Sequence, residues 1–147
     1  MLADMIQRLF DRSIDDAAQT RAREGEWLAE IWAEIEEMGL PLALLGEDAG
    51  GFGLTPAEAG ETLRLLGRHA VPLPVAETMA ANRLLAAAGL PLAGGAAGLA
   101  RADGLELAGG HLRGQVARVA WGEQLDCLAV AVGDTLYRVP RSGWTIA

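Results

Sequence analysis

The sequence is short of positive charge. Its 147 residues contain 12 arginines, no lysine and 20 aspartates and glutamates, so the net charge is -8 at pH 7. The excess of acids lies in residues 1–90, whereas residues 91–147 are neutral overall. Phosphate binding depends on clustered positive charge. The acidic part of the chain therefore argues against nucleic acid and anionic membranes as partners.

Cysteine and histidine are also scarce. The single cysteine, Cys127, lies in an apolar run and cannot form an internal disulfide, which fits a reducing compartment and predicts a cytoplasmic protein. We expect it to be a small buried side chain rather than a nucleophile. His69 and His111 stand far apart, and a metal site needs several ligands at defined spacing, so no metal site is predicted.

Long apolar runs without interruption are absent. The N-terminus carries Asp4 and no basic region, so it is not expected to be a signal peptide. Residues 84–100 are uncharged over 17 positions, but glycine and proline interrupt them five times. A membrane helix needs a longer continuous stretch. The sequence predicts a helix end and a linker here, and no membrane span.

Apolar residues recur at helical spacing through residues 1–92. Their spacing predicts four helices, over residues 3–19, 24–38, 56–69 and 75–88. Each helix has one apolar face, which predicts a four-helix orthogonal-type bundle. We expect this helical unit to form the first domain.

Glycine, threonine and proline mark the helix boundaries. Gly39 follows an apolar-periodic run and is expected to close the second helix. Thr55, Pro56 and Glu58 form the pattern of a capping box at the start of the third helix. That helix is expected to bury Leu63 among other apolar residues.

Residues 93–147 show a different pattern. Short runs rich in valine and leucine are separated by two-residue glycine turns, which predicts antiparallel hairpins of about four strands. The expected fold class is thus α+β, with a partial barrel or sandwich as a second domain. So small an open sheet leaves edge amides unpaired. We therefore expect something outside this sequence to complete it.

The glycine-rich loop at Gly51-Phe52-Gly53 allows two interpretations. It opens a helix, as a dinucleotide-binding fingerprint does, but Pro56 occupies the position of the third glycine. No βαβ unit surrounds it. A turn followed by an N-cap is the preferred interpretation.

An ordered series of short motifs runs through residues 32–78. It begins with Trp32 and the Gly39-Leu40 helix end. It continues with Leu42-Ala43-Leu44-Leu45 before Glu47-Asp48, then Gly50-Gly51-Phe52-Gly53, Leu66-Gly67-Arg68 and Pro72-Leu73-Pro74-Val75-Ala76-Glu77-Thr78. In this order the motifs resemble the N-terminal helical domain of the acyl-CoA dehydrogenases.

The resemblance implies a cofactor, a substrate and a site. Family members follow the helical domain with a β domain and a second helical domain, and they use FAD. A glutamate removes the α proton of an acyl-CoA thioester while the β hydride passes to the flavin. Residues 112–131 resemble the β domain of the family, which would place FAD against Val119, Ala120 and Trp121.

Three departures from the family pattern limit what the resemblance implies. Ala120 falls where a serine or threonine usually faces the flavin, so only backbone contact is expected there. The usual T-E-x-x-x-G-S-D segment is absent, and a linker over residues 94–103 takes its place. No glutamate of this chain can be assigned as the catalytic base, which most members carry in the third domain, so no catalytic residue is predicted.

The resemblance therefore implies a part or subunit of a flavin-dependent acyl-CoA dehydrogenase, inactive alone because the C-terminal helical domain is missing. The expected assembly is a homo-oligomer or a complex with a partner acyl-CoA dehydrogenase subunit. One alternative is a non-catalytic interaction module with the same helical fold. Another is an unrelated helical and β protein.

Overall fold

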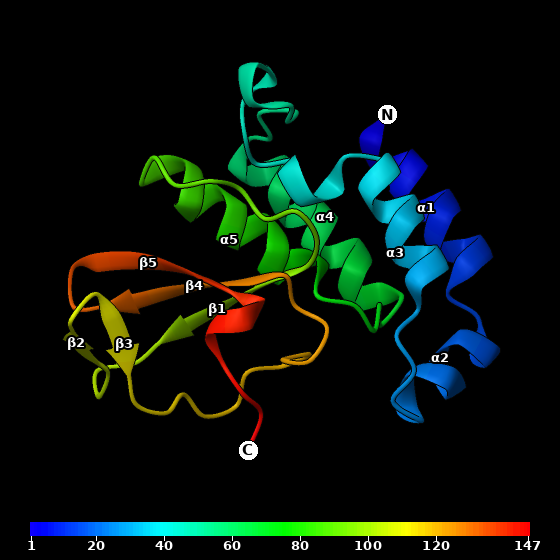
Figure 1. Cartoon of the computed structure of the whole chain (residues 1–147). Coiled ribbons are helices and arrows are strands. Elements are labelled where there is room, and N and C mark those ends of the chain that lie inside the picture. The colour runs from blue at the N-terminus through cyan, green and yellow to red at the C-terminus, as the bar shows by residue number, and fades with distance from the viewer.

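The computed structural model describes residues 1–147 as five α-helices followed by two small sheets. The helices are α1 (Leu2–Ser13), α2 (Asp16–Arg23), α3 (Ala29–Glu37), α4 (Pro56–Arg68) and α5 (Val75–Ala87). The strands are β1 (Ala97–Arg101), β2 (Glu106–Ala108), β3 (His111–Arg113), β4 (Cys127–Val132) and β5 (Thr135–Pro140). In Figure 1, α5 lies between the larger sheet and the other helices. The predicted α+β class, helices first, is confirmed.

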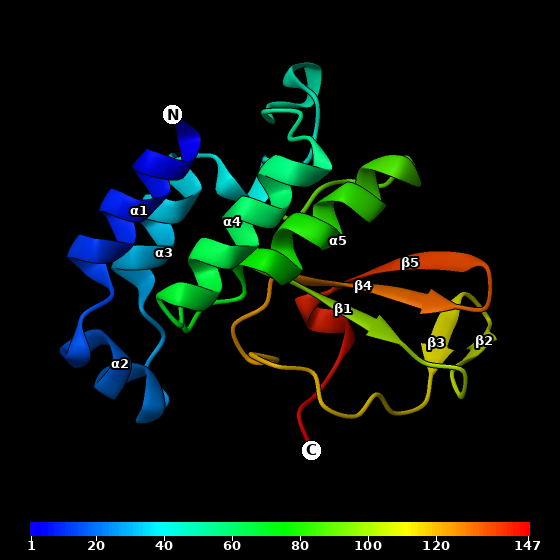
Figure 2. The same ribbon diagram turned by 180° about the vertical axis from the view of Figure 1, so that it is seen from behind.

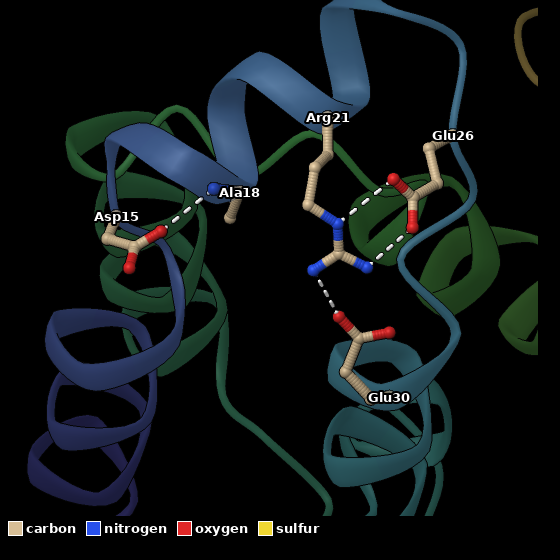
Figure 3. Close-up of polar contacts among 5 residues, drawn as sticks. All are labelled: Asp15, Ala18, Arg21, Glu26 and Glu30. Atoms are coloured by element: carbon tan, nitrogen blue, oxygen red, sulfur yellow. Dashed lines mark hydrogen bonds and ion pairs between the residues drawn. The ribbon is translucent and has the colours of Figure 1, made fainter.

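The helix predicted over residues 3–19 is in fact two helices, so the bundle has five helices rather than four. Asp15 has extended backbone and its carboxylate accepts a hydrogen bond from the Ala18 amide at 2.8 Å (Figure 3). An aspartate in this position satisfies an amide that the start of a helix leaves without a partner. The apolar spacing continues across this cap, which is why periodicity alone predicted one helix.

The second predicted helix is shorter than expected but ends where predicted. Gly25 has a φ of 87° and turns the chain after α2, so that α3 begins only at Ala29. Gly39 has a φ of 82° and follows the C-cap residue Met38. A glycine takes this left-handed conformation without the cost that a Cβ imposes.

The capping box at the start of α4 is confirmed. The Thr55 hydroxyl accepts from the Glu58 amide, and the Glu58 carboxylate accepts from the Thr55 amide at 2.8 Å. The preceding loop is a turn rather than a nucleotide-binding fingerprint. The prediction that Leu63 is buried was wrong, because α4 packs through Thr62 and Leu65 while Leu63 is 50% exposed.

Buried polar side chains fasten α5 to the segments around it. The Asn82 amide nitrogen donates to the Pro41 carbonyl at 3.1 Å, and its oxygen accepts from the Ala93 amide at 2.9 Å. The Thr78 hydroxyl accepts from the Ala97 amide at 3.0 Å. These bonds satisfy backbone groups that would otherwise be buried without partners. They also fix where β1 begins relative to the helices.

The larger sheet has the order β1-β4-β5, and β2 pairs with β3 in a separate hairpin. β5 is antiparallel to β4, but β1 is parallel to β4 with Ala97 opposite Cys127. The expectation of antiparallel pairs throughout was therefore wrong. The residues predicted as a linker contain β1. Its parallel partner β4 lies far along the chain, so no tight turn joins the two strands and no turn signal marks the pair in the sequence.

One hydrophobic core extends through both parts of the chain. A cluster of 18 buried residues contains side chains from α1, α3, α4 and α5 together with Leu125, Leu128 and Val130. A smaller cluster packs α5 against Cys127 and Ala129 on the other side of β4. Figure 2 shows the same layers from behind, with α5 against the sheet. None of the helices has the length and apolar character needed to cross a membrane.

Candidate functional site

A cleft lies between the helical part and the segment that joins β3 to β4. This segment, residues 114–126, is called the β3–β4 segment below. The cleft has a volume of about 460 Å³, and Trp27 and Trp121 contribute the aromatic part of its wall. Its other lining residues are Gln19, Ala22, Arg23, Gly25, Glu26, Pro72, Glu123 and Gln124.

A second hollow of about 450 Å³ adjoins the first, because Trp27, Glu123 and Gln124 line both. Trp32 also lines it, and the rings of Trp27 and Trp32 lie 5.6 Å apart. Carboxylates outnumber arginines in the combined lining: they are Glu26, Glu36, Glu123 and Asp126, against Arg23 and Arg141. The combined cleft is therefore aromatic and acidic.

A network of hydrogen bonds around Arg21 lies beside the cleft and holds Glu26, one of the lining residues. Arg21, near the end of α2, donates two hydrogen bonds to Glu26 and one to Glu30 at the start of α3 (Figure 3). The hydrogen bond with Arg21 lowers the pKa of Glu26, and the same interaction lowers the pKa of Glu30. Glu26 is therefore held ionised as a partner of Arg21, next to Trp27.

The three residues predicted to contact FAD lie in the β3–β4 segment, but only one of them lines the cleft. Trp121 is half-buried and forms part of the cleft wall. Val119 is half-buried against the main core, and Ala120 is exposed. None of the three lies on a strand: residues 112–121 form one of the short runs that were predicted as strands, but β3 ends at Arg113.

The backbone around these residues has two unusual properties. Arg118 and Trp121 have φ values of 61° and 53°, which is uncommon for residues with a Cβ. No protein group accepts a hydrogen bond from the amides of Val119, Ala120 or Trp121. Strained backbone of this kind tends to occur at functional sites.

FAD is the cofactor that the sequence resemblance implies, and the lining of the cleft can be compared with what its parts require. A flavin ring is flat and carries hydrogen-bonding groups along its edge. Trp121 offers an aromatic surface to the cleft, whereas Val119 and Ala120 do not line it. The acid-rich walls of the cleft do not suit the diphosphate of FAD, because like charges repel. The cleft therefore offers an aromatic surface but does not suit the diphosphate.

Sequence reasoning missed the part of the site that comes from the helical region. Trp27 lies within the helix predicted over residues 24–38, but in the structure it precedes α3 and lines both hollows. Gln124 was not singled out at all. No sequence signal brings these residues together, because one follows α2 and the other precedes β4, almost a hundred residues apart.

Comparison with known proteins identifies the family. A sequence model of the acyl-CoA dehydrogenase N-terminal domain matches residues 1–100, about two-thirds of the chain. No curated protein and no solved structure gave a match. The matched region contains all five helices and most of β1. The chain therefore belongs to the acyl-CoA dehydrogenase family.

Proposed function

We propose that this chain is part of a flavin-dependent acyl-CoA dehydrogenase, in which it supplies the helical domain and one wall of the flavin site. The complete enzyme would remove two hydrogens across the α,β bond of an acyl-CoA thioester. The observation that carries the proposal is the free backbone of residues 119–121 beside Trp121, in a chain of this family. The boundary between the two units is proposed near residue 92.

The residues of this chain would bind and orient the flavin rather than react. The amides of Val119, Ala120 and Trp121 would donate to acceptors on the ring edge, and the Trp121 indole would pack against the ring face. Bound FAD would supply the hydride acceptor. The Trp27 and Trp32 rings would limit access of water to the cleft from the helical side.

A catalytic base from outside these 147 residues completes the proposal. A base must lie within hydrogen-bond reach of the proton that it takes, and its pKa must suit the operating pH. The four carboxyl groups with displaced pKa values, Glu26, Glu30, Glu58 and Glu61, all have them lowered by hydrogen bonds. Lowered pKa values make these groups weaker bases. The base would come from a partner subunit or another copy of a family member.

Titration of the purified chain with FAD tests the flavin site, with the absorbance and fluorescence of FAD as the readout. We expect binding by the wild-type chain, alone or with a co-purifying subunit, and loss of most of that binding in Ala120→Glu. Ala120 is exposed, so the substitution should leave the fold intact. The introduced carboxylate would lie beside the ring edge and repel the nearby carbonyl groups of the flavin.

Ala117→Glu provides the matched control. Ala117 is also an exposed alanine of the β3–β4 segment, three positions before Ala120, and it lies outside the proposed contact. We expect this variant to bind FAD as the wild type does. Equal FAD affinity in all three proteins would contradict the assignment of residues 119–121.

A second candidate function is a non-catalytic acyl-CoA dehydrogenase-like interaction module. It is favoured by Ala120, which replaces the hydroxyl that usually faces the flavin, and by the acidic cleft, which does not suit a diphosphate. In this case the chain would form a complex with an active acyl-CoA dehydrogenase without binding FAD itself. Full dehydrogenase activity of the complex with both Ala120→Glu and Trp121→Arg would support this alternative.

A further inference from the structure

The second hollow lies between α3 and the residues that precede β1 and β4. Trp32 and Glu36 are one helical turn apart, so they present an indole and a carboxylate on the same face of α3. The other side of the hollow consists of residues 94–96 and 123–126. Glu36 and Glu123 are both exposed. Carboxylates from two separate parts of the chain therefore line one open hollow.

These carboxylates differ in how far their charge is already balanced. Asp126 accepts a hydrogen bond from the Gly94 amide at 2.8 Å and lies 3.7 Å from the guanidinium of Arg138. The carboxylates of Glu36 and Glu123 have no ion-pair partner in the protein. The hollow thus contains two negative charges that no other side chain of this protein offsets.

Arg141 is the one cation of this lining, and its guanidinium is already engaged. It lies 5.0 Å from the centre of the Trp144 ring. It also donates to the carbonyl groups of Glu123 at 3.4 Å and Trp144 at 3.0 Å. With one cation against three carboxylates, the lining keeps an excess of negative charge.

The position of Glu36 in α3 gives a separate reason to expect a positively charged ligand. Glu36 lies in the last turn of the helix, where no basic side chain is present. The C-terminal end of a helix carries partial negative charge, so an acidic side chain there is unfavourable. A cation bound beside Glu36 would offset both charges.

Trp32 supplies a polar group without a partner. It is only 6% exposed, and of the four tryptophans only Trp144 donates its indole hydrogen to a protein acceptor. The one fully buried side-chain polar atom without a partner is Nε2 of His69, so the Trp32 nitrogen keeps some contact with solvent. The exposed part of Trp32 lines the second hollow. An indole N–H is therefore offered to a ligand in this hollow, in addition to negative charge.

A guanidinium group suits this lining better than a metal ion. No group of three histidine, cysteine, aspartate or glutamate side chains could hold a metal. A guanidinium is planar, pairs with carboxylates through several N–H groups and stacks on aromatic rings. The rings of Trp27 and Trp32 lie 5.6 Å apart, inclined by 47°, and offer such a surface.

We infer that the second hollow receives an arginine side chain of a partner protein, together with the adjoining peptide group. The guanidinium would lie between Glu36 and Glu123, against the tryptophan rings. A main-chain carbonyl of the partner would accept from the Trp32 indole. Peptide carbonyls accept hydrogen bonds without the negative charge that the acidic lining would repel. The net charge of -8 also favours a basic segment as the ligand. This inference does not depend on flavin binding.

The tripeptide acetyl-Gly-Arg-Gly-amide tests the site, in an NMR titration that follows the indole N–H signals. We expect saturable binding in about the millimolar range, with a downfield shift of the Trp32 signal as it gains an acceptor. The Trp144 indole already donates to the Gly122 carbonyl, so its signal should move little. The same peptide with citrulline in place of arginine keeps the shape without the charge, and should bind about fivefold more weakly. Equal binding of the two peptides would contradict a guanidinium site.

Glu36→Gln and Glu123→Gln remove the two charges at exposed positions with little change of shape. Each should weaken binding of the arginine peptide about two- to fivefold, as for the loss of an exposed ion pair. Glu37→Gln is the matched control, because Glu37 is the exposed neighbour of Glu36 and lies outside the lining. It should bind the peptide as the wild type does. An equal loss in Glu36→Gln and Glu37→Gln would assign the effect to overall charge and overturn the site.

Two smaller ligands separate a protein partner from other sources of the same cation. Ethylguanidinium lacks the carbonyl groups, and free L-arginine carries a carboxylate, so both should bind several-fold more weakly than the tripeptide. Ethylguanidinium that binds as tightly would overturn the role of the Trp32 indole, and free arginine that binds as tightly would overturn the assignment to a protein. Absence of a saturable Trp32 shift with the tripeptide overturns the whole inference, whatever the flavin titration shows.

Discussion

Gly51 and Gly60 differ in what surrounds them. A Cβ on Gly51 would lie 2.1 Å from the Leu45 carbonyl oxygen and 2.2 Å from that of Leu42, whereas a Cβ on Gly60 would meet nothing within 4 Å. Backbone oxygens inside a tight loop cannot move away as the end of a flexible side chain can. The glycine-rich motif that suggested the family is therefore required by packing at Gly51.

We predict opposite effects for alanine at these two positions. Gly51→Ala should lower the free energy of unfolding by about 3 kcal/mol, at the upper end of overpacking costs. Gly60→Ala should raise it by about 0.5 to 1 kcal/mol, because alanine is the better helix former at an open position in α4. Urea denaturation of the two variants and the wild type measures both. A stable Gly51→Ala protein would show that the loop can open.

The sequence could indicate Trp121 as a site residue but could not place it. Its position in a motif of the family made it a candidate. Its backbone is left-handed, with a φ of 53°, and no local sequence pattern predicts this conformation for a tryptophan. Val119 and Trp121 both pack against the main core, but only Trp121 also lines the cleft.

At the level of elements, the caps were easier to predict than the helix count. Thr55, Pro56 and Glu58 act within four residues, so the capping box could be identified from the sequence. Asp15 is an equally good N-cap, but it lies within a continuous apolar stripe that suggested one long helix. β1 was missed for the opposite reason, because its stability comes from β4 and from Thr78 rather than from its own composition.

The Asp15 cap leads to a simple test. Asp15→Ala should lower the free energy of unfolding by about 1 kcal/mol, because the Ala18 amide loses its acceptor at the start of α2. Asp15→Asn keeps an acceptor oxygen and should cost much less. Chemical denaturation followed by circular dichroism compares the two variants. Equal losses would point to charge rather than capping.

The capping box of α4 predicts a dependence on pH. The backbone and hydroxyl hydrogen bonds from Thr55 lower the pKa of Glu58 below its ordinary value. A carboxyl group with a lowered folded-state pKa contributes stability that is complete above its unfolded-state pKa and is lost as the pH falls through the folded-state pKa. The Glu58 contribution should therefore disappear in the acid range.

Denaturation of the wild type and Glu58→Ala between neutral pH and about pH 3 measures this contribution, since the interval brackets the ordinary pKa of glutamate. We expect the wild type to be more stable at neutral pH and the difference to shrink on acidification. Because Glu58 is exposed, the effect should be small and should weaken with salt. A difference that stays constant with pH would assign it to helix propensity instead.

On the scale of the whole molecule, the helices and the sheet share one core. The larger cluster includes Ile6 and Phe10 of α1 as well as Leu128 and Val130 of β4. Small proteins with one core usually unfold in a single step. The boundary expected near residue 92 stays a prediction.

A substitution at Asn82 tests whether the helices and the sheet unfold in one step. Asn82→Ala leaves the Pro41 carbonyl and the Ala93 amide without partners and should cost about 3 kcal/mol, from two unsatisfied backbone groups and a small cavity. Leu84→Ala, at a half-exposed position of the same helix, should cost less than about 1 kcal/mol. We expect the Asn82→Ala loss in both tryptophan fluorescence and circular dichroism, with coincident midpoints. Separate midpoints would indicate that the two parts unfold independently.

The parallel pairing of β1 with β4 predicts an order in which the strands pair during folding. β4 meets β5 across Gly133 and Asp134, whereas β1 is separated from β4 by residues 102–126. Local hairpins close early, because strands far apart in the sequence lose more chain entropy when the loop between them closes. β1 should therefore pair with β4 last, after α5 has placed Thr78 where it accepts from the Ala97 amide. Pulse-labelling during refolding should find the amides of β1 protected later than those of β5. Until then the edge of β4 that pairs with β1 lies open, so the newly made chain is most vulnerable to mispairing at the strand that is most deeply buried in the finished protein.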